Sequence, residues 1–105
     1  MLRDAIYQIR IIDTHEHLEK EPKWVEQGPD ALGALFDNYV LQDIVAAGVP
    51  SEAATQVVTR PGDVRERFGI IAAAWARAQH TGYGEAVRLA AEAVYGIDHI
   101  DAAAL

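Results

Sequence analysis

Only one segment of this 105-residue chain has the pattern of a β-strand, and this limits the folds open to it. Within residues 10–14, the β-branched Ile11 and Ile12 stand together in a run too short for a stable helix. No second convincing strand follows, and a lone strand cannot satisfy its own backbone N–H and C=O groups. We therefore expect a mostly α fold, in which this segment lies on the helices or pairs with strands on sequence outside the chain.

Apolar residues at helical spacing dominate the rest of the chain. The strongest pattern begins after Asp30, a residue type that favours helix starts. Two later patterns end at Gly82 and Gly96, a residue type that favours helix ends. Residues 18–28 show no period, and Pro22, Gly28 and Pro29 interrupt this polar stretch, so we expect it to form a loop. The predicted helices cover residues 2–9, 31–47, 52–58, 64–81, 83–95 and a short stretch after Asp98, with N-caps at Asp30, Ser51, Asp63 and Asp98.

The composition excludes several classes of protein. A formal net charge of −7 with scattered basic residues argues against a nucleic-acid partner, which needs clustered Lys and Arg. Cysteine is absent, so disulfides, zinc ribbons and thiol catalysis are excluded. The sequence contains neither a signal peptide nor an apolar run long enough to cross a membrane. We expect a soluble, cytoplasmic protein with a modest core, because alanine supplies many of its apolar residues.

Two histidines separated by one residue follow the strand-like run, in the sequence IIDTHEHL. Residues two apart on a strand share a face, so Asp13, His15 and His17 would project together, with neighbouring Cα atoms roughly 6–7 Å apart. Two imidazoles can then bind one metal ion at about 2.0–2.1 Å, with the carboxylate as a further ligand or an orienting partner. The alternative is a pair of solvated loop histidines. The metalloprotease and cysteine-dependent deaminase patterns are both incomplete here.

These residues resemble a known metal site. The IIDTHEHL segment looks like the His-x-His motif that ends the first barrel strand of the amidohydrolase superfamily, whose members are (β/α)8 TIM-barrel enzymes. The helical stretch after it, including TGYGEAVRLAAEAVYGID, resembles the helical insertion of the branch that contains uronate isomerases. The resemblance implies that His15 and His17 bind a divalent metal ion, with Asp13 at the same strand end. Zinc is the expected ion, and manganese, iron and nickel are alternatives.

The resemblance also implies an organisation and an activity. Residues 1–28 would carry the opening helix, the first barrel strand and the His-x-His loop, and residues 29–105 would form a helical insertion subdomain. The metal of the whole enzyme would activate water and polarise a carbonyl group of a small-molecule substrate, to hydrolyse a C–N or C–O bond, or would bind the oxygens of a sugar acid for isomerisation. The other ligands would lie beyond Leu105, where the chain stops inside an alanine-rich helical run, so we expect the chain alone to be inactive.

A small helical interaction module with incidental histidines is the alternative function. Helices that normally cover a sheet expose large apolar patches when the sheet is absent, so either function predicts association through exposed apolar faces or a homo-oligomer. The other notable side chains fit structural roles. Those predicted to be core or interface are Trp75, Tyr39, Tyr83 and Tyr95, and those predicted to lie at the surface are His80, His99, Arg65 and Arg67.

Overall fold

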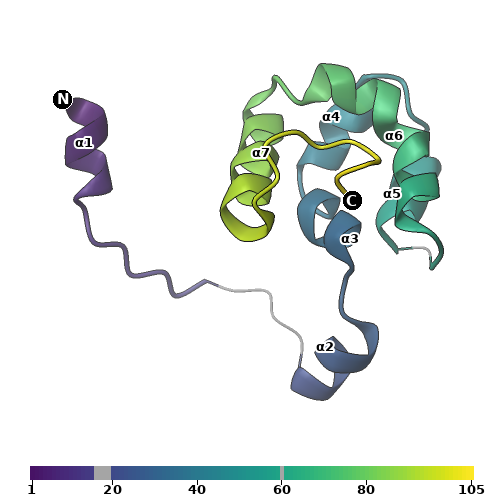
Figure 1. Ribbon diagram of the computed structural model, residues 1–105, viewed down its shortest axis with the longest axis horizontal. Coiled ribbons are helices and arrows are strands. Elements are labelled where there is room, and N and C mark those ends of the chain that lie inside the picture. Colours follow the sequence, from purple (N-terminus) through teal and green to yellow (C-terminus); the bar gives the residue numbers. More distant parts are fainter. Residues whose placement is uncertain (16–19, 60) are drawn as a thin grey trace.

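The computed structural model describes residues 1–15, 20–59 and 61–105, and the regular structure in this part of the chain is entirely helical (Figure 1). The mostly α prediction is therefore confirmed. The helices are α1 (Leu2–Tyr7), α2 (Glu21–Gln27), α3 (Ala31–Phe36), α4 (Val40–Ala46), α5 (Ser51–Thr59), α6 (Val64–Ala78) and α7 (Gly82–Tyr95). The strand predicted at residues 10–14 is not formed within the described residues, because an extended segment becomes a strand only when a neighbour shares its backbone hydrogen bonds.

Helices α3 to α7 pack into one bundle, while α1 and α2 lie outside it (Figure 1). The fully buried Phe36 is central to the core, because its ring meets the ring of Trp75 edge-on at 5.0 Å and that of Phe68 at 6.3 Å between centroids. Edge-to-face pairs of this kind stabilise a core beyond the area that they bury. The other core residues are Leu32, Leu35, Val40, Ile44, Ala54, Val57, Val58, Ile71, Ala74, Ala78, Val87, Ala91 and Ile100.

The single helix predicted over residues 31–47 is in fact two, α3 and α4, and Asn38 accounts for the break between them. Its Nδ2 donates to the Leu35 carbonyl at 2.8 Å, and its Oδ1 accepts from the Val40 N–H at 2.9 Å. An asparagine side chain competes in this way with the helical pattern of backbone hydrogen bonds. The break turns the chain, so that α3 and α4 both contribute to the same core.

Three of the predicted helix boundaries are confirmed in atomic detail. Asp30 accepts from the Gly33 N–H at 3.0 Å at the start of α3, and Asp63 accepts from the N–H groups of Arg65 and Glu66 at 2.9 and 3.1 Å at the start of α6. Gly96 ends α7 in the left-handed conformation, with φ of 67°. These boundaries depend on side chains or backbone within a few residues, which is why the sequence predicts them.

Gly82 was predicted to end a helix, and instead it begins α7. The reason is Thr81, whose hydroxyl accepts from the Gly84 N–H at 3.0 Å and so caps the new helix, while donating to an Asp43 carboxylate oxygen at 2.6 Å. The turn from α6 into α7 is tight. A Cβ atom on Gly84 would lie 1.9 Å from the Ala78 carbonyl oxygen, so this corner requires glycine.

Three other predictions about helices and their boundaries are wrong. Residues 21–27 form α2 where a loop was expected. Pro22 is compatible with this helix because it lies in the first turn, where a backbone N–H has no partner within the helix to lose. Residues 98–104 form bends and turns instead of a last helix. There the Asp101 carboxylate accepts from the Ala104 N–H at 2.8 Å and closes a local turn. Ser51 was predicted to be the N-cap that precedes a helix, but it is the first residue of α5.

Residues 1–15, which we call the N-terminal arm, extend away from the bundle (Figure 1). The arm consists of α1 followed by a stretch without helix, and every residue in it is exposed. Its apolar side chains are uncovered, with Ile11 and Ile12 at 82% and 85% exposure. Across the described ranges, no helix combines the length and apolar character needed to cross a bilayer.

Candidate functional site

Two of the three candidate metal-site residues, Asp13 and His15, lie at the end of the N-terminal arm. The Asp13 Oδ1 atom accepts a hydrogen bond from the backbone N–H of His15 at 3.0 Å. An aspartate that binds the amide two residues further on forms an Asx turn, which fixes the local backbone without other support. The carboxylate and the imidazole therefore belong to one local unit, and both residues are exposed to solvent.

The third candidate, His17, lies outside the described residues. The two-residue spacing between His15 and His17 therefore comes from the sequence alone. Among residues 1–15, 20–59 and 61–105, no three His, Asp or Glu side chains come together as a metal-binding group.

The donors at the arm suit the metal ions that the sequence predicts. An imidazole nitrogen with a carboxylate oxygen is a ligand combination found for zinc, manganese, iron and nickel. Asp13 was predicted as a ligand or as an orienting partner for an imidazole N–H. In the structure one of its oxygens accepts a hydrogen bond from the backbone N–H of His15, the residue that carries the first imidazole.

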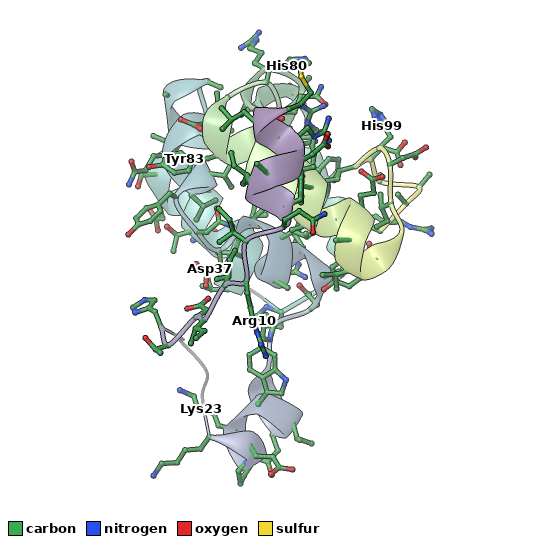
Figure 2. All side chains as sticks on the ribbon, turned by 90° about the vertical axis from the view of Figure 1, so that its left-hand side faces the viewer. Arg10, Lys23, Asp37, His80, Tyr83 and His99 are labelled. Atoms are coloured by element: carbon green, nitrogen blue, oxygen red, sulfur yellow. The ribbon has the colours of Figure 1, made fainter. Side chains whose placement is uncertain are left out.

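The two other histidines are surface residues, as predicted. His80 follows the end of α6 and is exposed, and His99 lies in the C-terminal turns (Figure 2). The His99 Nε2 atom is 3.9 Å from the Asp101 Oδ2 atom, and both side chains are largely in water, at 68% and 48% exposure. An ion pair of this kind contributes little to stability.

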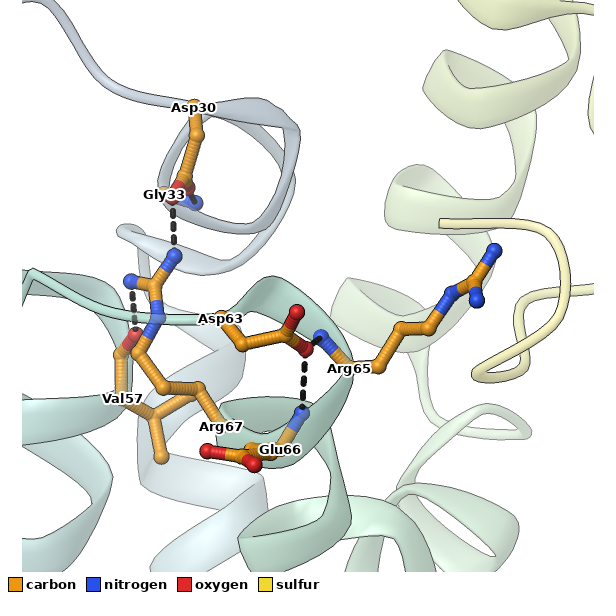
Figure 3. A network of polar contacts seen from close by, with 7 residues as sticks. All are labelled: Asp30, Gly33, Val57, Asp63, Arg65, Glu66 and Arg67. Atoms are coloured by element: carbon orange, nitrogen blue, oxygen red, sulfur yellow. Dashed lines mark hydrogen bonds and ion pairs between the residues drawn. The ribbon is translucent and has the colours of Figure 1, made fainter.

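Arg67 is the polar residue whose role sequence reasoning missed. We predicted that Arg65 and Arg67 share an exposed helix face, and Arg65 is indeed exposed, but the Arg67 side chain retains only 7% of its accessible surface. Its guanidinium donates to the Asp30 carboxylate through Nη2 and to the Val57 carbonyl through Nη1, the latter at 2.8 Å (Figure 3). The Nε atom is buried without a partner in the described part of the chain.

A signal for this burial was present in the sequence. Arg67 stands three residues after Val64 and four before Ile71, so it falls on the apolar stripe of α6. A charged residue on such a stripe is buried only when a partner meets it. That partner, Asp30, is 37 residues away in the sequence, and its carboxylate also caps α3.

The aromatic predictions have mixed outcomes. Trp75 is core, at 3% exposure, as predicted. Tyr39, Tyr83 and Tyr95 are not core, because they remain 66%, 49% and 44% exposed. The rings of Tyr39 and Tyr83 pack on each other at 5.6 Å between centroids, and Tyr83 is seen at the surface in Figure 2.

Comparisons of the chain with protein-family models, with curated proteins and with solved structures gave no significant match.

Proposed function

We propose that this chain supplies the N-terminal metal half-site of an amidohydrolase-like enzyme, with His15 and His17 as metal ligands and Asp13 supporting them. The observation that carries the proposal is the spacing Asp13-x-His15-x-His17 directly after an aliphatic run. The hydrogen bond from the His15 N–H to Asp13 supports it, because it ties the acid to the backbone of the first proposed ligand.

The exposed arm suits the first strand of a barrel. Parallel barrel strands are buried on both faces and are therefore continuously apolar. In the structure Ile9, Ile11 and Ile12 are 64%, 82% and 85% exposed, an apolar run that neighbouring strands would cover. Helices α3 to α7 have their own core and would form the inserted helical subdomain. The uronate-isomerase branch is the proposed relative because its insertion follows this strand.

The site would work as one part of a larger ligand set. A divalent ion held there would supply Lewis-acid activation of water and of a substrate carbonyl group. The role of His15 and His17 is to hold and orient that ion through neutral imidazole nitrogens, and Asp13 fixes the backbone of the first ligand. Catalytic sites need three or more protein ligands, so the half-site by itself binds metal weakly and does not turn over substrate.

A zinc titration by calorimetry tests the proposal, using the tag-free chain. The expected result is one weak site per chain that is lost in both His15→Ala and His17→Ala. His80→Ala is the matched control, because His80 is an exposed histidine outside the motif, and it should leave the titration unchanged. Equal zinc binding by the wild type and the His15→Ala variant would contradict the proposal.

A turnover assay tests the incompleteness of the site. Amide, ester and sugar-acid substrates with zinc or manganese should give no turnover by this chain alone. Metal-dependent turnover at about 1 per second or faster, an ordinary rate for a complete enzyme, would contradict the half-site if His15→Ala abolished it.

The second candidate function is a helical interaction module, favoured by the uncovered apolar side chains of the arm. The two candidates differ in a simple measurement. Absence of zinc binding together with a concentration-dependent dimer would favour the module, whereas binding that depends on His15 and His17 favours the half-site.

A further inference from the structure

The chain exposes far more surface than a compact protein of its size. Its accessible area is 7960 Å², whereas a compact monomer of 11.5 kDa exposes about 5,800 Å². Its radius of gyration is 15.1 Å, against about 13 Å for a compact domain of 105 residues. The excess of roughly 2,000 Å² per chain is larger than the about 800 Å² that each partner buries in a stable protein–protein interface.

Part of this excess is the apolar face of α1. Leu2 and Ile6 stand four residues apart on one face of α1 and are 77% and 54% exposed, and Ile9, 64% exposed, follows the end of the helix. A helix of six residues, as α1 is, lacks the length to be stable by itself in water. Such a helix is stabilised by packing its apolar face on another surface, and α1 buries no residue in this chain.

The bundle offers a matching surface on α7. This helix buries Gly84, Val87 and Ala91 against the core, and the side of the helix next to this buried stripe is apolar too. The residues of that side fall within about 100° of one another around the helix, and all are exposed. We call them the α7 outer face: Tyr83, Ala86, Ala90, Ala93 and Val94.

Two properties make the α7 outer face suitable for a helix. Its three alanines leave shallow space between Tyr83 and Val94, into which larger side chains can pack. Its polar edge carries Glu85 and Glu92 against a single arginine, Arg88.

The charges of the two surfaces are complementary. Residues 1–10 carry two arginines and one acid, whereas residues 30–105 carry five arginines and ten acids. Residues 1–10, whose side chains carry a net charge of +1, are therefore attracted to the acidic bundle at long range, and the apolar side of α1 is held by apolar contact at short range.

We propose that α1 of one copy docks on the α7 outer face of a second copy, and that the exchange is reciprocal. The structure favours a second copy because α1 lies apart from its own bundle and buries no residue against it (Figure 1). Reciprocal exchange of an arm covers both apolar helices in one closed two-fold dimer. This dimer uses α1 and α7 only, so it does not depend on metal binding by the residues that follow.

Sedimentation of the full chain over a range of concentrations tests the proposal. Ile6→Asp and Ala90→Asp should each weaken the dimer by about 100-fold or more, because each change occurs twice in a symmetric dimer and each loss of an apolar contact is worth roughly tenfold. Ile70→Asp is the matched control, since Ile70 is a half-exposed apolar residue on α6, and it should leave the dimer intact. Helical circular dichroism shows whether each variant remains folded.

Mixing the two monomeric variants distinguishes this dimer from other arrangements. An Ile6→Asp chain retains the α7 outer face and an Ala90→Asp chain retains the arm, so the mixture should form a heterodimer with one of the two contacts. The chain lacks cysteine, so an Ile6→Cys chain mixed with an Ala90→Cys chain should also form a disulfide between copies. A monomer at all concentrations, dissociation by only one of the two Asp substitutions, or a disulfide within single chains of the double Cys variant would overturn the proposal.

Discussion

Removing either partner of the Arg67–Asp30 ion pair should destabilise the bundle, but by different amounts. The Arg67 side chain is 7% exposed, whereas that of Asp30 is 40% exposed. In Asp30→Ala a buried guanidinium loses its counter-charge and cannot reach water. In Arg67→Met the remaining carboxylate is partly in water already and can be hydrated. The loss of stability should therefore be larger in Asp30→Ala.

The contacts set the size of the difference. Asp30→Ala removes an N-cap worth about 1 kcal/mol and leaves a buried charge unpaired, for a total of about 3–4 kcal/mol. Arg67→Met loses the bonds to Asp30 and to the Val57 carbonyl, but it also removes the buried Nε that lacks a partner among the described residues, for a net loss of about 1–2 kcal/mol. Asp63→Ala is the control, because it removes an exposed cap alone and should cost about 1 kcal/mol.

Thermal and urea unfolding followed by circular dichroism measure these losses. For a domain of this size, each kcal/mol of lost stability lowers the melting temperature by about 4–8 °C. The melting temperature should therefore fall by at least about 12 °C in Asp30→Ala, and the fall in Arg67→Met should be about half as large as the fall in Asp30→Ala, or smaller. The double variant should be less destabilised than the sum of the single ones, because no charge is then left unpaired. Two results would refute this account of the buried pair. One is a loss of stability in Asp30→Ala that is no larger than that in Asp63→Ala, and the other is a larger loss in Arg67→Met than in Asp30→Ala.

Three further predictions concern the bundle and the arm. Phe36→Ala removes a fully buried ring from contact with Trp75 and should cost about 3–5 kcal/mol in urea unfolding; stability within about 1 kcal/mol of wild type would contradict its central place in the core. Gly84→Ala should destabilise by about 1–3 kcal/mol or prevent folding, because its Cβ would meet the Ala78 carbonyl, whereas Gly82→Ala, with open space around it, should change stability by less than about 0.5 kcal/mol. Deleting residues 1–15 should leave the unfolding of dilute, monomeric protein unchanged, since the arm buries nothing in its own bundle, and a lower melting temperature of that monomer would show otherwise.

The candidate site depends partly on local sequence and partly on tertiary structure. The spacing of Asp13, His15 and His17 is a property of the sequence, and strand geometry alone turns that spacing into a prediction of shared metal ligation. The Asx turn that ties Asp13 to the His15 amide is also local, although the expected strand geometry did not predict it. A complete ligand set is a different matter, because it requires side chains brought together from distant parts of a chain.

The sequence by itself determined the helix boundaries that depend on local interactions. The caps at Asp30 and Asp63 and the end at Gly96 involve atoms within a few residues, so residue type and spacing suffice to predict them. Errors arose where a local signal had two outcomes. Gly82 can end one helix or begin the next, and Pro22 can stop a helix or open its first turn.

Only the tertiary structure decided which apolar and charged side chains are covered. Val94 lies on an apolar side of α7 but is 71% exposed, and Tyr83 beside it is covered only in part, by the ring of Tyr39. Arg67 is buried because α3 brings Asp30 to it from far along the sequence. Periodicity determines which residues share a helix face, whereas burial depends on whether another element packs against that face, and a contact between distant residues leaves no mark on the spacing within one helix.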